Sequence, residues 1–138
     1  MFDHYKGLAH IALRTMDVEK SIEFYEKIGG KVVKADILGT EKGDKLLALV
    51  EFAGITLELI QVFEPVESGV SPHFAIYVDN LLDVVHEIAS TGIDSFPTKR
   101  IQRLKMFGGL TNWVLNGPGG EQIEFIQIEE HIEDQIEE

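Results

Sequence analysis

Polar and apolar residues alternate at the start of two similar segments of the chain. His10, Ala12 and Arg14 alternate with Ile11 and Leu13, and the run from Phe74 to Val78 directly follows His73. A period of two is typical of a strand that has one face on a hydrophobic core and the other face in a different environment. We therefore expect a strand at each place, with its histidine on the face away from the core.

A helical pattern follows each of these strands. In the first segment the apolar residues at helical spacing are Val18, Ile22, Tyr25 and Ile28. Asp17 is placed to cap this helix and Gly29-Gly30 to end it. In the second segment the apolar residues are Leu81, Leu82, Val85 and Ile88. There Asp79 is the predicted cap and Gly92 the predicted end.

Three strand-like runs follow each predicted helix. They are residues 31–35, 45–52 and 55–62 in the first segment, and residues 93–99, 109–115 and 122–128 in the second. Turn-forming residues separate them, so both segments have the order βαβββ. The sequence predicts an α+β fold in which two βαβββ modules form a cupped mixed sheet. A single domain, 1–138, would then hold a first module at 7–64, a linker from Pro65 to Pro72, a second module at 71–128 and an acidic tail at 129–138.

The repeat also holds residue by residue. His73 stands 63 positions after His10, and the same offset carries Ala12 to Ala75 and Gly29 to Gly92. Glu124 stands 66 positions after Glu58, which also carries Gly54 to Gly120. A loop that is three residues longer in the second segment reconciles the two offsets.

Strand alternation places four polar residues on the faces opposite the helices. Glu58 lies between Leu57 and Leu59, as Glu124 lies between Ile123 and Phe125. Together with His10 and His73 they supply two imidazoles and two carboxylates, which suffice to bind one divalent metal ion. Such groups in apolar strands are costly to desolvate unless they are paired or bound to a cation. For either histidine alone, a hydrogen-bonded core residue is the alternative interpretation.

Composition excludes several classes of function. The net charge of −12 argues against a nucleic-acid partner. The longest apolar run, 46–50, is far shorter than the roughly 20 residues that span a bilayer. There is no cysteine, which excludes thiolate metal ligands, and the N-terminal residues do not resemble a secretory signal. We expect a cytoplasmic protein with no membrane contact.

Three further sets of residues indicate a function less specifically. Four basic residues form a cluster that can receive a substrate carboxylate or phosphate, or can keep an edge strand soluble: Lys99, Arg100, Arg103 and Lys105. Three aromatic residues can line a pocket, although aromatic residues in strands usually belong to the core: Tyr77, Phe107 and Trp113. Three histidines have no partner pattern and are predicted at the surface: His4, His86 and His131.

From about Leu8 to Ile128 this pattern resembles the vicinal oxygen chelate superfamily, which contains glyoxalase I, extradiol dioxygenases and the bleomycin resistance proteins. The resemblance implies a glyoxalase/bleomycin resistance/dioxygenase-like fold. The metal ligands of glyoxalase I fall on these residues: His10, Glu58, His73 and Glu124. Arg14 matches an arginine that holds the substrate in glyoxalase I, whereas Val62 stands where glyoxalase I usually has an asparagine.

The resemblance implies a glyoxalase-like, metal-dependent lyase or isomerase that moves a proton on a small carbonyl or hemithioacetal substrate. Glu58 or Glu124 would be the catalytic base, and one divalent ion (Zn, Ni, Co, Mn or Fe) would occupy each site. It also implies a homodimer in which His10 and Glu58 meet His73 and Glu124 of the other chain. Two alternatives stay open: a non-catalytic protein that sequesters a drug or ligand, as bleomycin-resistance relatives do, and an Fe(II) dioxygenase-like enzyme.

Overall fold

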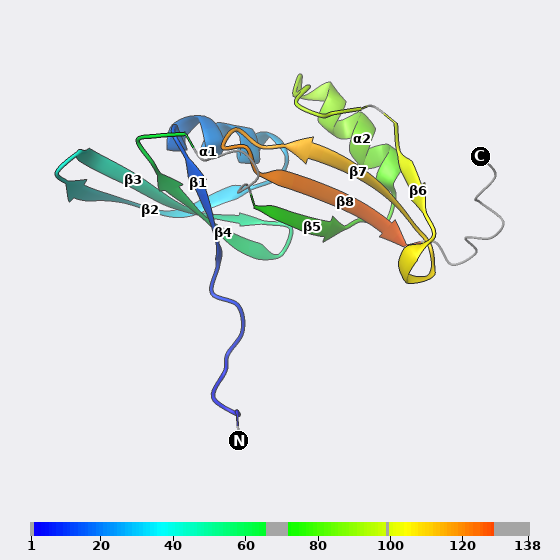
Figure 1. Cartoon of the computed structure of the whole chain (residues 1–138), viewed down its shortest axis with the longest axis horizontal. Helices are drawn as coiled ribbons and strands as arrows, with labels where there is room; N and C mark the ends of the chain where they lie inside the picture. Colours follow the sequence, from blue (N-terminus) through cyan, green and yellow to red (C-terminus); the bar gives the residue numbers. More distant parts are fainter. Residues whose placement is uncertain (1, 66–71, 99, 129–138) are drawn as a thin grey trace. The chain divides into compact units, whose positions relative to one another are not determined.

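The computed structural model describes residues 2–65, 72–98 and 100–128. The chain forms two compact units, Met1–Pro65 and Val66–Glu138. Each unit contains a four-stranded mixed sheet and one α-helix (Figure 1). This confirms the predicted α+β fold of two βαβββ modules. The predicted tail, 129–138, and most of the predicted linker lie outside the described residues.

The first unit carries its sheet in the order β1-β4-β3-β2. Its elements are β1 (Ile11–Thr15), α1 (Val18–Lys27), β2 (Lys31–Thr40), β3 (Gly43–Phe52) and β4 (Ile55–Gln61). β1 runs parallel to β4, and the other neighbours are antiparallel. The first and last strands of the unit are therefore side by side, because the helix carries the chain from β1 to the far edge of the sheet.

The second unit repeats this arrangement, with its sheet in the order β5-β8-β7-β6. Its elements are β5 (His73–Tyr77), α2 (Leu81–Ser90), β6 (Gln102–Leu104), a 3₁₀ turn (Met106–Gly108), β7 (Leu110–Asn116) and β8 (Gln122–Ile128). β5 is parallel to β8 as β1 is to β4. In the described part of the chain, no helix is long and apolar enough to cross a membrane.

Each helix covers one face of its own sheet, and the other face carries both polar and apolar residues. α1 packs on β3 and β4, and α2 packs on β7 and β8 (Figure 1). The largest buried side chains come from both the helices and the sheets, among them Tyr25 of α1, Leu57, Trp113 and Leu115. Hydrophobic burial thus fixes which face of the central strands points to the core.

The residue that caps the helix N-terminus is the predicted one in the first unit and a different one in the second. The Asp17 side chain caps α1, accepting a hydrogen bond of 3.0 Å from the Lys20 backbone N–H, as predicted. α2 is capped by Asn80, which accepts from the Asp83 N–H at 3.1 Å, so the prediction of Asp79 was wrong by one residue. Both residue types cap well, and the β conformation of Asn80 decides between them.

Two strands differ from prediction. β2 extends to Thr40, because backbone pairing with β3 continues along a hairpin whose outer residues are exposed and have no clear alternation. The strand predicted at 93–99 is absent from the described part of that stretch, and β6 lies later. Pro97 has no N–H to donate to a ladder, and Ser95 instead binds the end of β7 through its backbone carbonyl and its hydroxyl.

A tight turn at Ala53 and Gly54 joins β3 to β4, the strand that carries Glu58. Both residues have positive φ, 52° and 81°, which is the requirement of a type I′ hairpin turn. Glycine adopts this conformation freely, but alanine is strained there because its Cβ crowds the backbone. The turn is therefore a local weak point in the hairpin.

We predict that Ala53→Asn raises the free energy of unfolding by about 0.5 to 1 kcal/mol, because asparagine tolerates positive φ better than alanine. Urea denaturation followed by circular dichroism measures the change. Gly54→Ala is the matched control and should lower stability by about 1 kcal/mol, since nothing but backbone strain opposes the added methyl group. Equal stability of all three proteins would contradict this account of the turn.

Candidate metal and substrate site

The first candidate pair joins the residue before β1 to the middle of β4. Glu58 is the register partner of Ala12, two residues beyond His10. The Nε2 atom of His10 and the Oε1 atom of Glu58 are 3.2 Å apart. The two side chains are 40% and 25% exposed, so both remain accessible on the sheet face away from α1.

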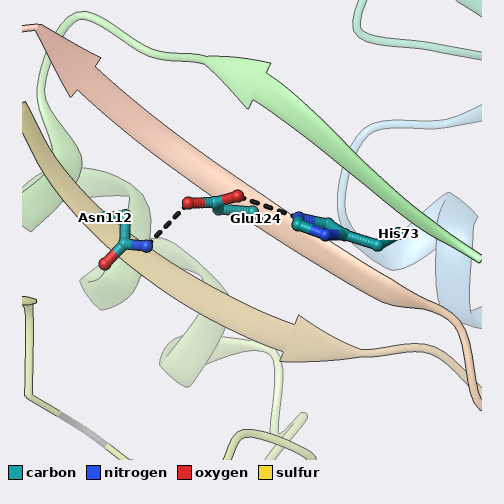
Figure 2. A network of polar contacts seen from close by, with 3 residues as sticks. All are labelled: His73, Asn112 and Glu124. Carbon is teal, nitrogen blue, oxygen red and sulfur yellow. Dashed lines mark hydrogen bonds and ion pairs between the residues drawn. The ribbon is translucent and has the colours of Figure 1, made fainter. Parts of the chain in front are cut away.

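The second candidate pair has the same construction in the other unit. Glu124 is the register partner of Ala75, again two residues beyond the histidine, His73. The His73 Nε2 and Glu124 Oε1 atoms face each other (Figure 2) and are 2.8 Å apart. The two side chains are 55% and 14% exposed. Because a shift of one residue would turn either glutamate to the helix side, the matching register is what allows both pairs to form.

The donor sets of these pairs suit a divalent cation. Two ligand atoms roughly 2.0 to 2.2 Å from a tetrahedral cation are themselves about 3.3 to 3.6 Å apart. The 3.2 Å of the first pair is close to this spacing, whereas the 2.8 Å of the second pair is the length of a direct hydrogen bond. Imidazole nitrogen and carboxylate oxygen are ordinary ligands of Zn²⁺ and related ions. No three such donors come together among residues 2–65, 72–98 and 100–128, and the two pairs belong to different units.

Glu124 has a further partner that the sequence analysis missed. The Asn112 side chain, on β7, donates a hydrogen bond of 2.6 Å from its Nδ2 atom to the Oε2 atom of Glu124 (Figure 2). Asn112 is 7% exposed. A polar residue between Thr111 and Trp113 in a strand was the available signal, but only the register of β7 with β8 places it beside Glu124.

A cavity of about 380 Å³ adjoins the first pair. It is lined by His10, Lys34, Ala35, Asp36, Leu47, Ala48, Leu49 and Glu58. Its wall is largely apolar, with the histidine and glutamate as convergent polar groups, which is typical of a small-molecule site. Sequence patterns did not single out Lys34 or Asp36, because the edge strand β2 that carries them is exposed on both faces.

Arg14 lies on the same strand face as His10, as alternation predicted. It is exposed, and its register partner on β4 is Ile60. The glutamate that faces this strand is paired with His10, and Arg14 makes no ion pair within the described part of the chain. Its guanidinium is therefore available to an anionic group.

The basic cluster is spread over a loop and an edge strand. Lys99 lies outside the described residues, while Arg103 is in β6, at the edge of the second sheet. Arg100 lines a small cavity of about 190 Å³ together with Gln102 and Asn112, among others. Arg103 thus lies on an edge strand, as the soluble-edge interpretation requires, and the contact with a substrate anion stays a prediction.

The three aromatic residues and the remaining histidines differ in whether they are buried or exposed. Trp113 is core, 2% exposed, and its Nε1–H donates to the Thr98 carbonyl at 2.9 Å. Tyr77 and Phe107 are 78% and 85% exposed, so the expectation that strand aromatics are core was wrong for them. His4 and His86 are at the surface, as predicted. His131 lies outside the described residues.

Comparison with protein families gives a match over residues 7–125 to the Glyoxalase/Bleomycin resistance protein/Dioxygenase superfamily. The chain belongs to this superfamily. The match spans both units and includes all four residues of the two His–Glu pairs. Comparison with curated proteins gives no match.

Solved structures of the superfamily have the same fold at low sequence identity. A glyoxalase family protein from Enterococcus faecalis is 19% identical, with 88% of this chain and 98% of that chain covered and a TM-score of 0.72. A bleomycin resistance determinant encoded on transposon Tn5 is 21% identical (90% and 99% covered, TM-score 0.68). The fosfomycin resistance protein FosX from Listeria monocytogenes is 15% identical (88% and 92% covered, TM-score 0.67).

We predict that Glu58→Leu stabilises the metal-free protein by about 0.5 to 1 kcal/mol, because functional polar groups are commonly held at a cost in stability. Glu58 lies beside Leu49 on the neighbouring strand, and a leucine there would extend an apolar surface. Thermal and urea unfolding in the presence of a chelator measure the effect. The control, Glu51→Leu, changes an exposed residue of β3 and should stay within about 0.5 kcal/mol of the parent protein.

Proposed function

We propose that this protein is a metal-dependent lyase or isomerase of the glyoxalase type, which moves a proton between adjacent carbons of a small carbonyl or hemithioacetal substrate. The observation that carries the proposal is the duplicated His–Glu pair. Both pairs have the same strand register, both lie on the sheet face opposite the helix, and both bring a ring nitrogen within 3.2 Å of a carboxylate oxygen.

The proposed ligands are His10, Glu58, His73 and Glu124. A divalent ion bound by them supplies Lewis-acid stabilisation of the negative charge that develops on a substrate oxygen. Zn, Ni, Co, Mn and Fe all accept this mixture of nitrogen and oxygen ligands, so the donor set does not choose among them.

Side chains of the protein would carry out proton transfer and hold the substrate. A glutamate carboxylate at the site takes a proton from one carbon and returns it to the next, which is general acid–base catalysis. Leu47 and Leu49 line the cavity beside Glu58 and offer an apolar surface to the substrate. Arg14, on the same face as His10, is the proposed contact for an anionic part of the substrate.

A complete site needs both pairs, and the two pairs are on different units. We propose a homodimer in which His10 and Glu58 of one chain meet His73 and Glu124 of the other. Removal of either histidine would then abolish metal binding at both sites of the dimer, because every site takes one pair from each chain.

The competing function is non-catalytic sequestration of a drug or other ligand. One of the solved structures with this fold is a bleomycin-binding protein complexed with bleomycin, 20% identical to this chain with a TM-score of 0.66. The net charge of −12 and the apolar cavity would suit a cationic ligand. An Fe(II) dioxygenase-like activity is a further alternative, and bound iron with consumption of oxygen would favour it.

Metal content and turnover together test the proposal. Protein purified without chelator should contain about one divalent ion per site by elemental analysis, and His10→Ala or His73→Ala should lose it. The reconstituted protein should isomerise a hemithioacetal, and Glu58→Gln or Glu124→Gln should lower kcat by about 10²- to 10⁴-fold. Glu51→Gln, at an exposed position on β3, is the control and should leave turnover unchanged.

Two results would count against this function. Tight ligand binding by metal-free protein, without turnover on any carbonyl substrate, would favour sequestration. Turnover that survives both glutamate substitutions would remove the proton-transfer role of these carboxylates.

A further inference from the structure

We propose that the two glutamates have different tasks: Asn112 holds Glu124 as a fixed metal ligand, and Glu58 is the carboxylate that carries the proton. This inference rests on the proposed metal-dependent function and assigns roles within the same site. It makes Asn112 a positioning residue, since it acts through Glu124.

Both carboxylate oxygens of Glu124 are engaged. Oε1 lies 2.8 Å from the Nε2 atom of His73, and Oε2 accepts the 2.6 Å hydrogen bond from the Nδ2 atom of Asn112 (Figure 2). The side chain is 14% exposed. Contacts on both oxygens fix the rotation of the carboxylate and direct one oxygen toward the histidine.

The amide of Asn112 is oriented by this contact. Its Oδ1 atom is buried and has no hydrogen-bond partner within the described part of the chain. The opposite orientation of the amide would direct that oxygen at the carboxylate and replace an attraction with a repulsion. A buried carbonyl without a partner is unfavourable for folding. Among the described residues, the contact that favours an asparagine at this position is its hydrogen bond to Glu124.

Glu58 has no counterpart of this hydrogen bond, which we call the clamp of Glu124, among the residues that the structure describes. The residue at the corresponding register position in the first unit is Leu47, since Leu47 pairs with Ile60 as Asn112 pairs with Ile126. Only the Oε1 atom of Glu58 has a partner, His10, among the residues that the structure describes. Glu58 is also more exposed than Glu124, 25% against 14%.

The freedom of Glu58 coincides with space for a substrate. Glu58 and Leu47 both line the cavity of about 380 Å³. A base that serves two adjacent carbons in turn must rotate between them, which a carboxylate held on both oxygens cannot readily do. Glu58 would take the proton of the C–H bond beside the carbonyl; the C–H electron pair then forms a C=C bond and the π pair of the carbonyl moves onto its oxygen. The proton of the substrate hydroxyl passes to that oxygen, and Glu58 returns its proton to the former carbonyl carbon as the other C–O bond becomes the new carbonyl, so no oxidant or reductant is consumed.

A reciprocal exchange of side chains tests the assignment. Asn112→Leu removes the clamp from Glu124 with little change in volume, and Leu47→Asn offers a clamp to Glu58. Zn²⁺ affinity is measured by competition with a chelator, and kcat and KM are measured on a hemithioacetal with saturating Zn²⁺. Circular dichroism and thermal unfolding of the metal-free proteins verify that each variant is folded, and Asn112→Ala is the second variant should Asn112→Leu fail to fold.

We expect Asn112→Leu to weaken Zn²⁺ binding by about 10- to 100-fold, the usual effect of removing a residue that orients a ligand. Leu47→Asn should keep the Zn²⁺ affinity and lower kcat by about tenfold or more, with KM little changed. A merely structural role of Asn112 would alter thermal unfolding without this selective loss of affinity.

The inference is overturned if Asn112→Leu and Asn112→Ala bind Zn²⁺ as tightly as the parent, or if Leu47→Asn retains full kcat. In that case the parent protein would still bind the ion and turn over, so the proposed function would survive. A parent protein that binds no divalent ion would instead overturn the proposed function and this inference together.

Discussion

Parallel pairing between the first and last strands of each unit is the constraint on which the site depends. Residues 51 positions apart in the sequence, such as His73 and Glu124, meet only because β5 and β8 are neighbours in a fixed register. That register is set by burial, since Ile123 and Phe125 must face the helix and so force Glu124 to the other side. Packing of the hydrophobic core on one face of the sheet therefore determines where the histidine and glutamate lie on the other face.

Both units have this parallel pairing. They differ in sequence at positions that do not contribute to the hydrophobic core. Positions under the helices are mostly apolar in both units, whereas the open faces carry Leu47 in one and Asn112 in the other. The repeated backbone thus provides equivalent positions in the two units. Different side chains at one such position, on the open face of the sheet, give the two glutamates different surroundings. Such differences are compatible with folding because they do not alter the packing between sheet and helix.

Much of the fold followed from the sequence because burial leaves a periodic pattern. The opening strands, both helices and the closing strands were predicted, and so was the face of the sheet on which His10 and Glu58 lie. The outer part of β2, residues 36–40, and the loop at 93–98 were not predicted, because exposed hairpins and proline-containing loops are held by hydrogen bonds that leave no periodic pattern in the sequence. Asn112 was missed for a related reason: alternation identifies a face, but a contact across strands requires the register.

The position of Trp113 has a consequence for experiments on a chain with an internal repeat. It is the only tryptophan in the sequence, and its ring lies between those of Phe96 and Phe125, with centroids 5.2 and 6.2 Å away. Its fluorescence, excited where tyrosine does not absorb, therefore reports on the interior of the second unit alone. Far-ultraviolet circular dichroism reports on both units, so a comparison of the two melting curves reveals whether the two halves melt in a single transition or one after the other.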